Sequence, residues 1–289
     1  MTDIVSVERS PRVSIVVPSR DGNRGGCVAR LMQSIDTQTF TDHEVILITG
    51  VTPQGKAINR GARKARGEIL LIIDDDSRLA DQDVLARLVA VLDSQKAIGM
   101  VGASVTPPPE ATTFQLRAAR QLPRFNTPVA AEVTDSDMAC HGCCAIPMDV
   151  FNDVGRERED IYRGLDPDLR ERLRKKGYRV VLAPNAVVYH PVPDGWRRLL
   201  KVFFRNGFGS AYAFKFARDS VYETHESANS GTFQPRRNFA YRTARFPLRL
   251  VRALATGEII RFAAYCAYGS GYLWGLIGAR EMKVNERGS

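Results

Sequence analysis

Three consecutive aspartates, Asp74, Asp75 and Asp76, directly follow the apolar segment 68–73. In an extended chain alternate side chains point to the same side, so Asp74 and Asp76 are expected to converge. Their carboxylate oxygens are ligands that Mg2+ and Mn2+ prefer, and such a cation stabilises the charge on a departing diphosphate. The plainer alternative is an acidic turn in which Asp76 or Ser77 caps the next helix. The cluster by itself favours neither interpretation.

Two other segments carry residues of chemical interest. Asp166 is followed by Pro167, a pair typical of a helix N-cap and the first helical position. The segment Cys140-His141-Gly142-Cys143-Cys144 contains a Cys-x-x-Cys pair, which zinc sites use. No second ligand pair follows at the spacing of zinc fingers, so we expect small residues lining a pocket here, with zinc as the alternative.

The elements that position the aspartates alternate along the first third of the chain. Apolar, β-branched runs predict strands at 12–18, 44–48, 68–73 and 98–101, and helical spacing is found at 27–36, 56–66 and 84–92. Gly67 would end the second helix as a C-cap. This alternation predicts an α/β fold whose mainly parallel sheet has helices on both faces. Ligands bind at the carboxyl ends of such strands, where the aspartates lie.

The rest of the chain is less regular. We expect a strand within 138–146, a helix at 168–176 that ends at Gly177, and two short strands at 179–182 and 186–189. After Pro193 the composition changes. A basic, aromatic helix is predicted at 196–218, a polar connection at 219–235, and an apolar segment with interspersed arginines at 246–279.

Bulk composition limits the classes of protein. With 289 residues, 44% hydrophobic and 25% charged, the chain is not globally disordered. Five cysteines, an odd number, do not suggest a disulfide framework. Residues 1–12 are polar and contain no apolar stretch of a signal peptide, which predicts a cytoplasmic location.

The net charge of +9 is concentrated at one end. Residues 196–289 contain 16 Lys and Arg against 6 Asp and Glu, whereas residues 1–195 contain 25 against 26. No acid lies between Glu226 and Glu258, where six arginines accumulate: Arg236, Arg237, Arg242, Arg245, Arg249 and Arg252. A basic block of this kind indicates nucleic acid, an anionic membrane surface or a role in solubility.

Five segments, in this order, resemble the family-2 glycosyltransferases of the GT-A fold over about residues 13–191. They are Val13–Arg20, Asn59–Glu68, the three aspartates, Gly164–Leu169 with Arg172–Val180, and Ala183–Pro184 with Val187–His190. The resemblance implies transfer of a sugar from a nucleotide-diphosphate donor, with Mn2+ or Mg2+ as cofactor. It also implies that residues 1–195 form the catalytic domain, with the nucleotide sugar bound by 12–105 and the acceptor by 106–195.

The resemblance assigns roles to individual residues. Those on the donor side are Pro18, Ser19 and Arg20 beside the base, Asn59 and Gly61 in the second helix, and Asp74 and Asp75 at the ribose and diphosphate. Asp76 and His190 would bind the metal. Asp166 would be the general base that deprotonates the acceptor hydroxyl, with inversion at the anomeric carbon. Asp168 is the next candidate for the base. His141 and Gly142 would line the acceptor pocket.

The chain departs from the family pattern at three places. The second strand is followed by Thr49-Gly50-Val51-Thr52 where the family has an acidic pair that reads the base, so the donor base is open. Leu165 replaces the usual Glu before the general base. The Gln-x-x-Arg-Trp signature of processive synthases is absent, which favours single transfer.

Residues 196–289 are expected to hold the enzyme on the inner face of a cell membrane, near a lipid-linked or cell-envelope glycan acceptor. Arginines beside apolar faces are typical of an in-plane helix on an anionic surface. The expected apolar face comprises Phe246, Leu248, Leu250, Val251, Tyr265, Tyr268, Tyr272, Leu273 and Trp274. Residues 262–279 are also near the lower limit of a membrane span, and Gly271-xxx-Gly275 fits a helix-packing motif. Packing of these helices on the catalytic domain is an equal alternative.

Two other functions fit parts of the sequence. A sugar-nucleotide nucleotidyltransferase would need a glycine-rich phosphate loop with a lysine. The only basic residue within 22–26 is an arginine. A basic nucleic-acid-binding protein would leave the aspartate cluster and Asp166 without a task. We therefore expect no nucleic-acid partner.

Overall fold

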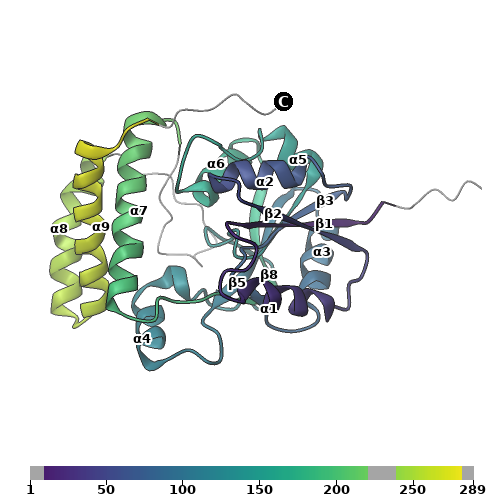
Figure 1. The fold of residues 1–289 in the computed structure, drawn as a ribbon, viewed down its shortest axis with the longest axis horizontal. Coiled ribbons are helices and arrows are strands. Elements are labelled where there is room, and N and C mark those ends of the chain that lie inside the picture. Colours follow the sequence, from purple (N-terminus) through teal and green to yellow (C-terminus); the bar gives the residue numbers. More distant parts are fainter. Residues whose placement is uncertain (1–9, 221–238, 282–289) are drawn as a thin grey trace, which may run out of the picture.

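The computed structural model describes residues 10–220 and 239–281. A central sheet is covered by helices on both faces, and three helices from the C-terminal part of the chain stand together at one side (Figure 1). Arg236 and Arg237 of the basic block lie outside the described residues, as does most of the polar connection 219–235.

The sheet has eight strands in the described part of the chain, in the order β2-β1-β3-β7-β5-β8-β4, with β6 paired to β8. They are β1 (Val13–Ser19), β2 (His43–Thr49), β3 (Ile69–Ile72), β4 (Arg78–Leu79), β5 (Ile98–Thr106), β6 (Thr134–Asp135), β7 (Cys144–Pro147) and β8 (Arg179–Tyr189). The pairs β1–β2, β1–β3 and β5–β8 are parallel, and β7 runs antiparallel between β3 and β5. The predicted mainly parallel α/β sheet is thus confirmed, but its antiparallel central strand was not foreseen.

The helices divide between the two faces because alternate strand residues point to opposite sides. They are α1 (Cys27–Asp36), α2 (Gln54–Ala62), α3 (Val84–Ser94), α4 (Thr113–Gln121), the 3-10 turn η1 (Pro123–Phe125), α5 (Met148–Asp153), α6 (Leu165–Lys175), α7 (Trp196–Phe216), α8 (Phe239–Ala255) and α9 (Ile259–Gly278). Val13, Ile15 and Val17 of β1 pack in one core with α1 and α3. Val16 packs in the other core with α2, α5 and α6.

Two expected helix ends were wrong. Helix α2 ends at Ala62, and Gly67 is not its C-cap. A Cβ at Gly67 would lie 2.7 Å from the backbone nitrogen of Ser14, so glycine is needed there for close approach to β1. Helix α6 begins at Leu165, with Gly164 at the N-cap position at φ 87°, which glycine adopts without strain. Asp166 and Pro167 therefore lie inside the first turn and do not form the expected cap.

The two short strands expected at 179–182 and 186–189 form one strand, β8. Its register against β5 shifts between the pairs Gly102–Leu182 and Ser104–Val187. Asn185 takes a left-handed φ of 54° within this irregularity and donates its backbone N–H to the carbonyl of Ala130. The strand continues past the bulge because pairing with β5 resumes at Val187, and it carries His190 to the same edge of the sheet as the aspartates.

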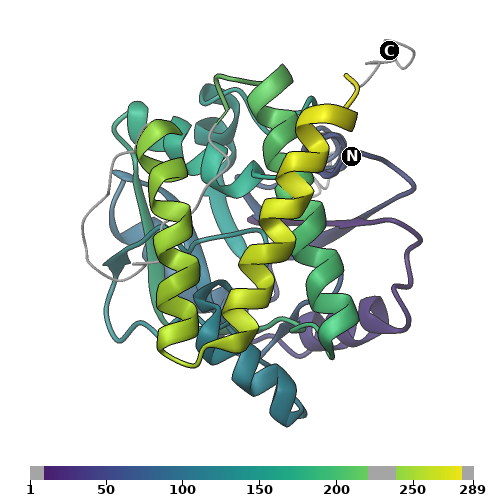
Figure 2. The ribbon, with the colours of Figure 1, turned by 90° about the vertical axis from the view of Figure 1, so that its left-hand side faces the viewer.

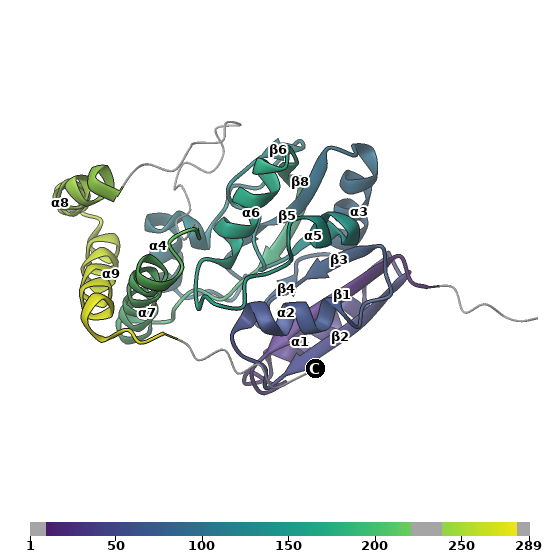
Figure 3. The ribbon, with the colours of Figure 1, turned by 90° about the horizontal axis from the view of Figure 1, so that it is seen from above.

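Helices α7 and α9 pack tightly through glycines, and α8 lies against α9 (Figures 2 and 3). A Cβ at Gly207 would lie 2.0 Å from the carbonyl oxygen of Tyr268, and one at Gly271 equally close to that of Phe204. Leu199 and Phe203 of α7 and Ile260 and Ala264 of α9 share a core with α4 and η1. The packing alternative for these helices is thus observed, with Gly271 and Gly275 at the contact. None of the described helices is both long and apolar enough to cross a bilayer.

Candidate active site

Asp74, Asp76 and His190 meet at the carboxyl end of β3. One ligand atom from each lies within 4.8 Å of the others. His190 Nε2 is 3.3 Å from Asp76 Oδ1 and 3.8 Å from Asp74 Oδ2. A turn in which Ser77 donates its N–H to the carbonyl of Asp74 places the two carboxylates together. Within the residues that the structure describes, this is the one group of three or more potential metal ligands.

The chemistry of this group suits a hard divalent cation. Asp74 and His190 are about a quarter exposed, while Asp76 is 6% exposed, so the group opens on one side. Burial lowers the pKa of His190, but hydrogen bonds and charge interactions with Asp74 and Asp76 raise it to about 10. Burial raises the pKa of Asp76, but His190 and Arg24 bring it below its ordinary value. The positive charge on His190 thus offsets the negative charges of the two carboxylates. A bound divalent cation would neutralise the carboxylates in its place. Asp74, assigned to the donor from the sequence, joins Asp76 in this group.

The alternative in which Asp76 or Ser77 caps the next helix is wrong. Helix α3 begins at Val84 with Asp83 at its N-cap position. The five residues after Ser77 include β4, which pairs antiparallel with β8. The aspartates are therefore free of any helix-capping task.

The last residue of β1, Ser19, contacts the acidic cluster through Asp75. Ser19 is 4% exposed and its hydroxyl donates to Asp75 Oδ2 at 2.6 Å. The same Ser19 oxygen accepts the backbone N–H of Gly22. Pro18 is buried in β1, and Arg20 is exposed beside Gly50, which donates to its carbonyl. Burial raises the pKa of Asp75, an effect that Ser19 and Arg24 partly offset.

Arg24 also belongs to this site, although the sequence did not point to it. It donates from Nη1 to Asp75 and from Nη2 to Asp76, at 2.6 and 2.5 Å. The loop that presents it is held by Asp21, which accepts the backbone N–H groups of Asn23 and Arg24. Gln54, at the start of α2, donates to Asp74 Oδ1 at 2.7 Å and was also missed. The signal was the polar loop 19–26 directly after the first strand, which was noted only for lacking a lysine.

Asp166 lies in the first turn of α6 and is linked to the cluster through His141, whose carbonyl accepts the N–H of Asp74. Its Oδ1 accepts the backbone N–H of His141 at 2.7 Å and lies 3.3 Å from His141 Nδ1, while a third of its side chain stays exposed. Burial raises the pKa of Asp166, but the charges of His141, Arg170 and Arg124 bring it below its ordinary value. Asp166 is therefore ionised and open to solvent at neutral pH, as a base that waits for an acceptor must be.

His141 links the acceptor side to the metal side. Its ring is 3% exposed, with Nε2 2.9 Å from Glu157 Oε1, and its carbonyl accepts the N–H of Asp74. Burial lowers the pKa of His141, but Asp166 and Glu157 raise it to about 10. Because the ring is buried between two carboxylates, it positions Asp166 and does not reach into an acceptor pocket. Gly142 is buried too, and a Cβ there would lie 3.9 Å from His190 Cδ2.

Asn59 and Gly61 have packing tasks instead of donor contacts. The Asn59 amide donates to the carbonyl of Glu157 and to Glu159, and its oxygen accepts the N–H of Glu157. With these three hydrogen bonds the amide has no donor hydrogen left for a nucleotide. A Cβ at Gly61 would lie 2.4 Å from Val16, so Gly61 allows α2 to approach β1. Asn59 thus supports Glu157, which in turn supports His141.

Two sequence alternatives lose their basis. Asp168, the second candidate for the base, is 3% exposed and is bound by Arg172 at 2.8 Å. For zinc, the described residues offer Cys140 and Cys143 no third ligand, and burial raises the pKa of both thiols. The segment 140–144 is therefore best described by its small, mostly buried side chains.

The chain is similar to known proteins in both sequence and fold. The family model described as "Glycosyltransferase like family 2" matches residues 2–209. Mannosyltransferase PcManGT from Pyrobaculum calidifontis, solved in complex with GDP-Man and Mn2+, is similar in structure with a TM-score of 0.61 at 18% identity, over 94% of this chain and 89% of that chain. GalNAc-T7, solved with UDP, GalNAc and Mn2+, has a TM-score of 0.50 at 14% identity, over 73% of this chain and 52% of that one. A search of curated protein sequences gave no significant match.

Proposed function

The chain belongs to the glycosyltransferase family 2-like proteins and is a glycosyltransferase with the GT-A fold, and we propose that it is an inverting, metal-dependent enzyme. It moves a single sugar from a nucleotide-diphosphate donor to a lipid-linked or cell-envelope glycan acceptor. The observation that carries this proposal is the joint position of Asp74, Asp76 and His190 at the strand ends, beside the ionised Asp166.

On this proposal Asp74, Asp76 and His190 hold Mn2+ or Mg2+. The bound cation supplies charge stabilisation to the diphosphate as it leaves. Both structural relatives described above were solved with Mn2+, and each of those complexes also holds nucleotide or nucleotide sugar. Ser19 and Arg24 hold Asp75 beside the proposed metal ligands. On this proposal the donor diphosphate lies along the loop 19–26.

The proposed reaction is a single displacement. The acceptor oxygen attacks the anomeric carbon, the bond from that carbon to the diphosphate oxygen breaks, and the electron pair leaves with the diphosphate. The hydroxyl proton passes to the free oxygen of Asp166. Attack from the side opposite the leaving group inverts the anomeric centre. His141 and Glu157 keep the Asp166 carboxylate in place, because the backbone and ring of His141 both contact Oδ1.

Residues 1–195 form the catalytic part of this proposal, and residues 196–289 bring it to an anionic membrane surface. Arg245, Arg249 and Arg252 of α8 are exposed, beside exposed apolar side chains on α8 and α9. These apolar side chains are Leu248, Val251, Leu254, Ile259, Leu273, Trp274 and Ile277. Phe246, Tyr265, Tyr268 and Tyr272, expected on the same face, are half-buried, and Phe246 contacts Tyr265. The apolar face is therefore more aliphatic than expected.

A thermal-shift panel tests the proposed donor chemistry. UDP, GDP, ADP and CDP would each be added to the full chain with Mn2+, with Mg2+ and with a chelator. At least one nucleoside diphosphate should raise the melting temperature only when a divalent cation is present, because Asp74, Asp76 and His190 would hold the cation and the cation would offset the negative charge of the diphosphate. Equal shifts in chelator and in Mn2+ would remove the metal from the proposal, and no shift with any nucleotide would remove the donor class.

A further inference from the structure

Three arginines from separate elements lie where α7 packs on the catalytic part, and the charges of Arg124 and Arg205 both act on Arg163. Arg124 belongs to η1, Arg163 precedes α6, and Arg205 lies on α7. Arg124 and Arg205 are exposed and Arg163 is half-buried, so all three can be reached from solvent. They form the group that we call the arginine cluster.

Contacts with α7 hold two of these side chains in place. The guanidinium of Arg124 lies over the rings of Phe125 and Phe203, at 5.3 and 5.9 Å from their centroids. The side chain of Arg163 crosses α7 at Gly209, where a Cβ would lie 2.7 Å from Arg163 Cγ. Arg205 and Gly209 are one helical turn apart on the same face of α7, which brings Arg205 beside Arg163.

The positive charge of the cluster is not neutralised by a direct ion pair among the described residues. No carboxylate of the described chain forms an ion pair or hydrogen bond with Arg124, Arg163 or Arg205, whereas Arg24, Arg172 and Arg174 each have such a partner. Burial and the charges of Arg205 and Arg124 lower the pKa of Arg163 to about 10. Packing three like charges together is unfavourable unless an anion joins them.

A second polar group on the same turn of α7 also lacks a partner. Asn206, next to Arg205 on α7, is 9% exposed, and its Nδ2 is buried without a hydrogen-bond acceptor among the described residues. A buried amide that lacks an acceptor costs free energy. The cluster also lies close to the reacting groups, since Arg124 interacts with the charge of Asp166 and Arg163 with that of Asp74.

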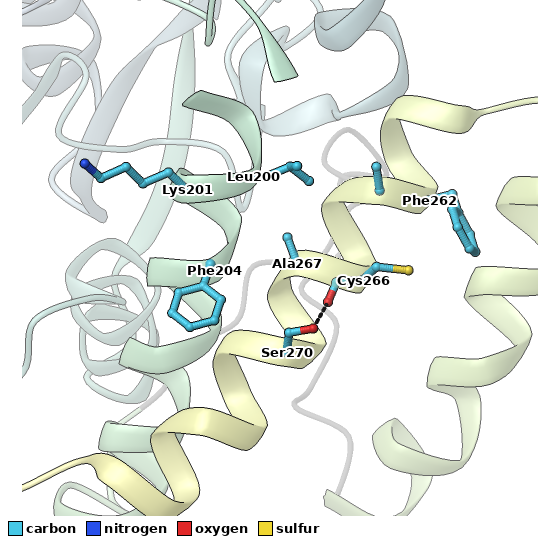
Figure 4. Close-up of a pocket in the computed structure, with 8 residues that line it drawn as sticks. Leu200, Lys201, Phe204, Phe262, Cys266, Ala267 and Ser270 are labelled. Carbon is cyan, nitrogen blue, oxygen red and sulfur yellow. Dashed lines mark hydrogen bonds between the residues drawn. The ribbon is translucent and has the colours of Figure 1, made fainter. Parts of the chain in front are cut away.

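An apolar groove of about 550 Å³ begins next to the cluster, between α7 and α9 (Figure 4). Leu200 and Phe204 line it from α7, and Phe262, Ala263 and Ala267 line it from α9. Lys201 stands at its edge, one helical turn before Arg205. A row of cations therefore leads from the catalytic site to an apolar surface.

We propose that the arginine cluster binds the phosphate part of a lipid-phosphate acceptor that carries a glycan, whose hydroxyl is the nucleophile and whose apolar chain follows the groove between α7 and α9. This inference rests on the proposed function and names the chemical class of its acceptor. Guanidinium groups bind phosphate through charge-assisted, often bidentate hydrogen bonds, and three of them suit the two negative charges of a diphosphate that joins lipid and glycan. The groove supplies the apolar surface that a soluble glycan would not need.

The test is calorimetry on the full chain with four probes: decyl phosphate below its micelle concentration, decanol, inorganic phosphate, and UDP or GDP with Mn2+. Arg163→Gln and Arg205→Gln should each weaken decyl phosphate binding about tenfold, because each removes one charge-assisted contact. Binding of the nucleoside diphosphate should change less than twofold. Arg197→Gln is the matched control, since Arg197 is an exposed arginine on the same helix.

Each other outcome has a defined meaning. Loss of nucleoside-diphosphate binding with decyl phosphate unaffected would overturn the proposal and assign the arginines to the donor. Inorganic phosphate binding as tightly as decyl phosphate, or decanol binding equally well, would overturn the lipid-phosphate assignment. Failure of the wild-type chain to bind any nucleoside diphosphate with Mn2+ would count against the proposed function alone, because the decyl phosphate result is read separately.

Discussion

Arg24 covers the acidic cluster, and its Nη2 lies 2.5 Å from Asp76 Oδ2, on the carboxylate that also faces His190. The guanidinium thus neutralises a group proposed to bind the metal. Arg24 is about half exposed and is carried by a loop, so it can move when a cation or diphosphate enters.

The first prediction follows from this competition. Arg24→Gln should raise the affinity for Mn2+ in the absence of nucleotide about fivefold, because an ion pair worth up to ~1 kcal/mol no longer competes for Asp76. Calorimetry with Mn2+ alone measures this, with Arg30→Gln as a control at an exposed arginine outside the cluster. Unchanged or weaker Mn2+ binding in Arg24→Gln would show that Arg24 does not compete with the metal.

Second, Asp76→Ala should remove most of the metal-dependent binding of the nucleoside diphosphate. Asp76 is the least exposed of the three proposed ligands and contacts both His190 and Arg24. Titration with the nucleoside diphosphate in Mn2+ and in chelator should give a large difference for the wild type and almost none for the variant. A variant that keeps the full Mn2+ effect would place the metal elsewhere.

Third, Asp166→Asn should abolish transfer and leave donor affinity nearly unchanged, since a base acts only as the acceptor attacks. The expected loss in turnover is ~10²–10⁴-fold. The amide keeps the shape of the carboxylate and can still accept the N–H of His141, so the melting temperature checks that folding is intact. Near-normal turnover would make Asp166 a structural residue of the α6 turn.

Fourth, replacing Arg245, Arg249 and Arg252 together with Gln should weaken binding to vesicles of equal parts phosphatidylglycerol and phosphatidylcholine. Basic residues near an anionic surface contribute ~1 kcal/mol each, so the loss should be roughly 10²-fold. Flotation at low salt measures it. Arg63, Lys64 and Lys96, exposed and remote from α8, provide the matched triple control. These point variants are better than a chain ending near residue 235, which would expose the apolar face of α7 that α9 covers.

Fifth, Gly271→Ala should destabilise the fold. The new methyl group would lie 2.0 Å from the carbonyl oxygen of Phe204, so α7 and α9 must move apart, at a cost of about 1–3 kcal/mol. Gly278→Ala, whose methyl group would meet no atom closer than 3.6 Å, should be neutral or slightly stabilising. Thermal unfolding compares the two variants, and equal melting temperatures would contradict the close packing of these helices.

The sequence by itself was enough for the α/β class of the sheet, the acidic cluster and the family, but not for the antiparallel strand β7. The runs around Ile15 and Leu71 predict buried strands because their hydrophobic pattern is local, and the three aspartates must follow wherever that strand ends. Asp166 and His190 were also named in advance, but through a resemblance and not through spacing, because 92 residues separate Asp74 from Asp166.

Only the tertiary structure decided which residues touch. Asn59 was expected at the donor, yet its amide is used by Glu157 and Glu159, about a hundred positions away in the chain. His141 was expected to meet the acceptor and is instead buried between Glu157 and Asp166. Arg124, Arg163 and Arg205 belong to three separate elements, and no local pattern joins them. Charge and hydrogen bonding act through space, so the order of residues along the chain could predict these elements but not the contacts between them.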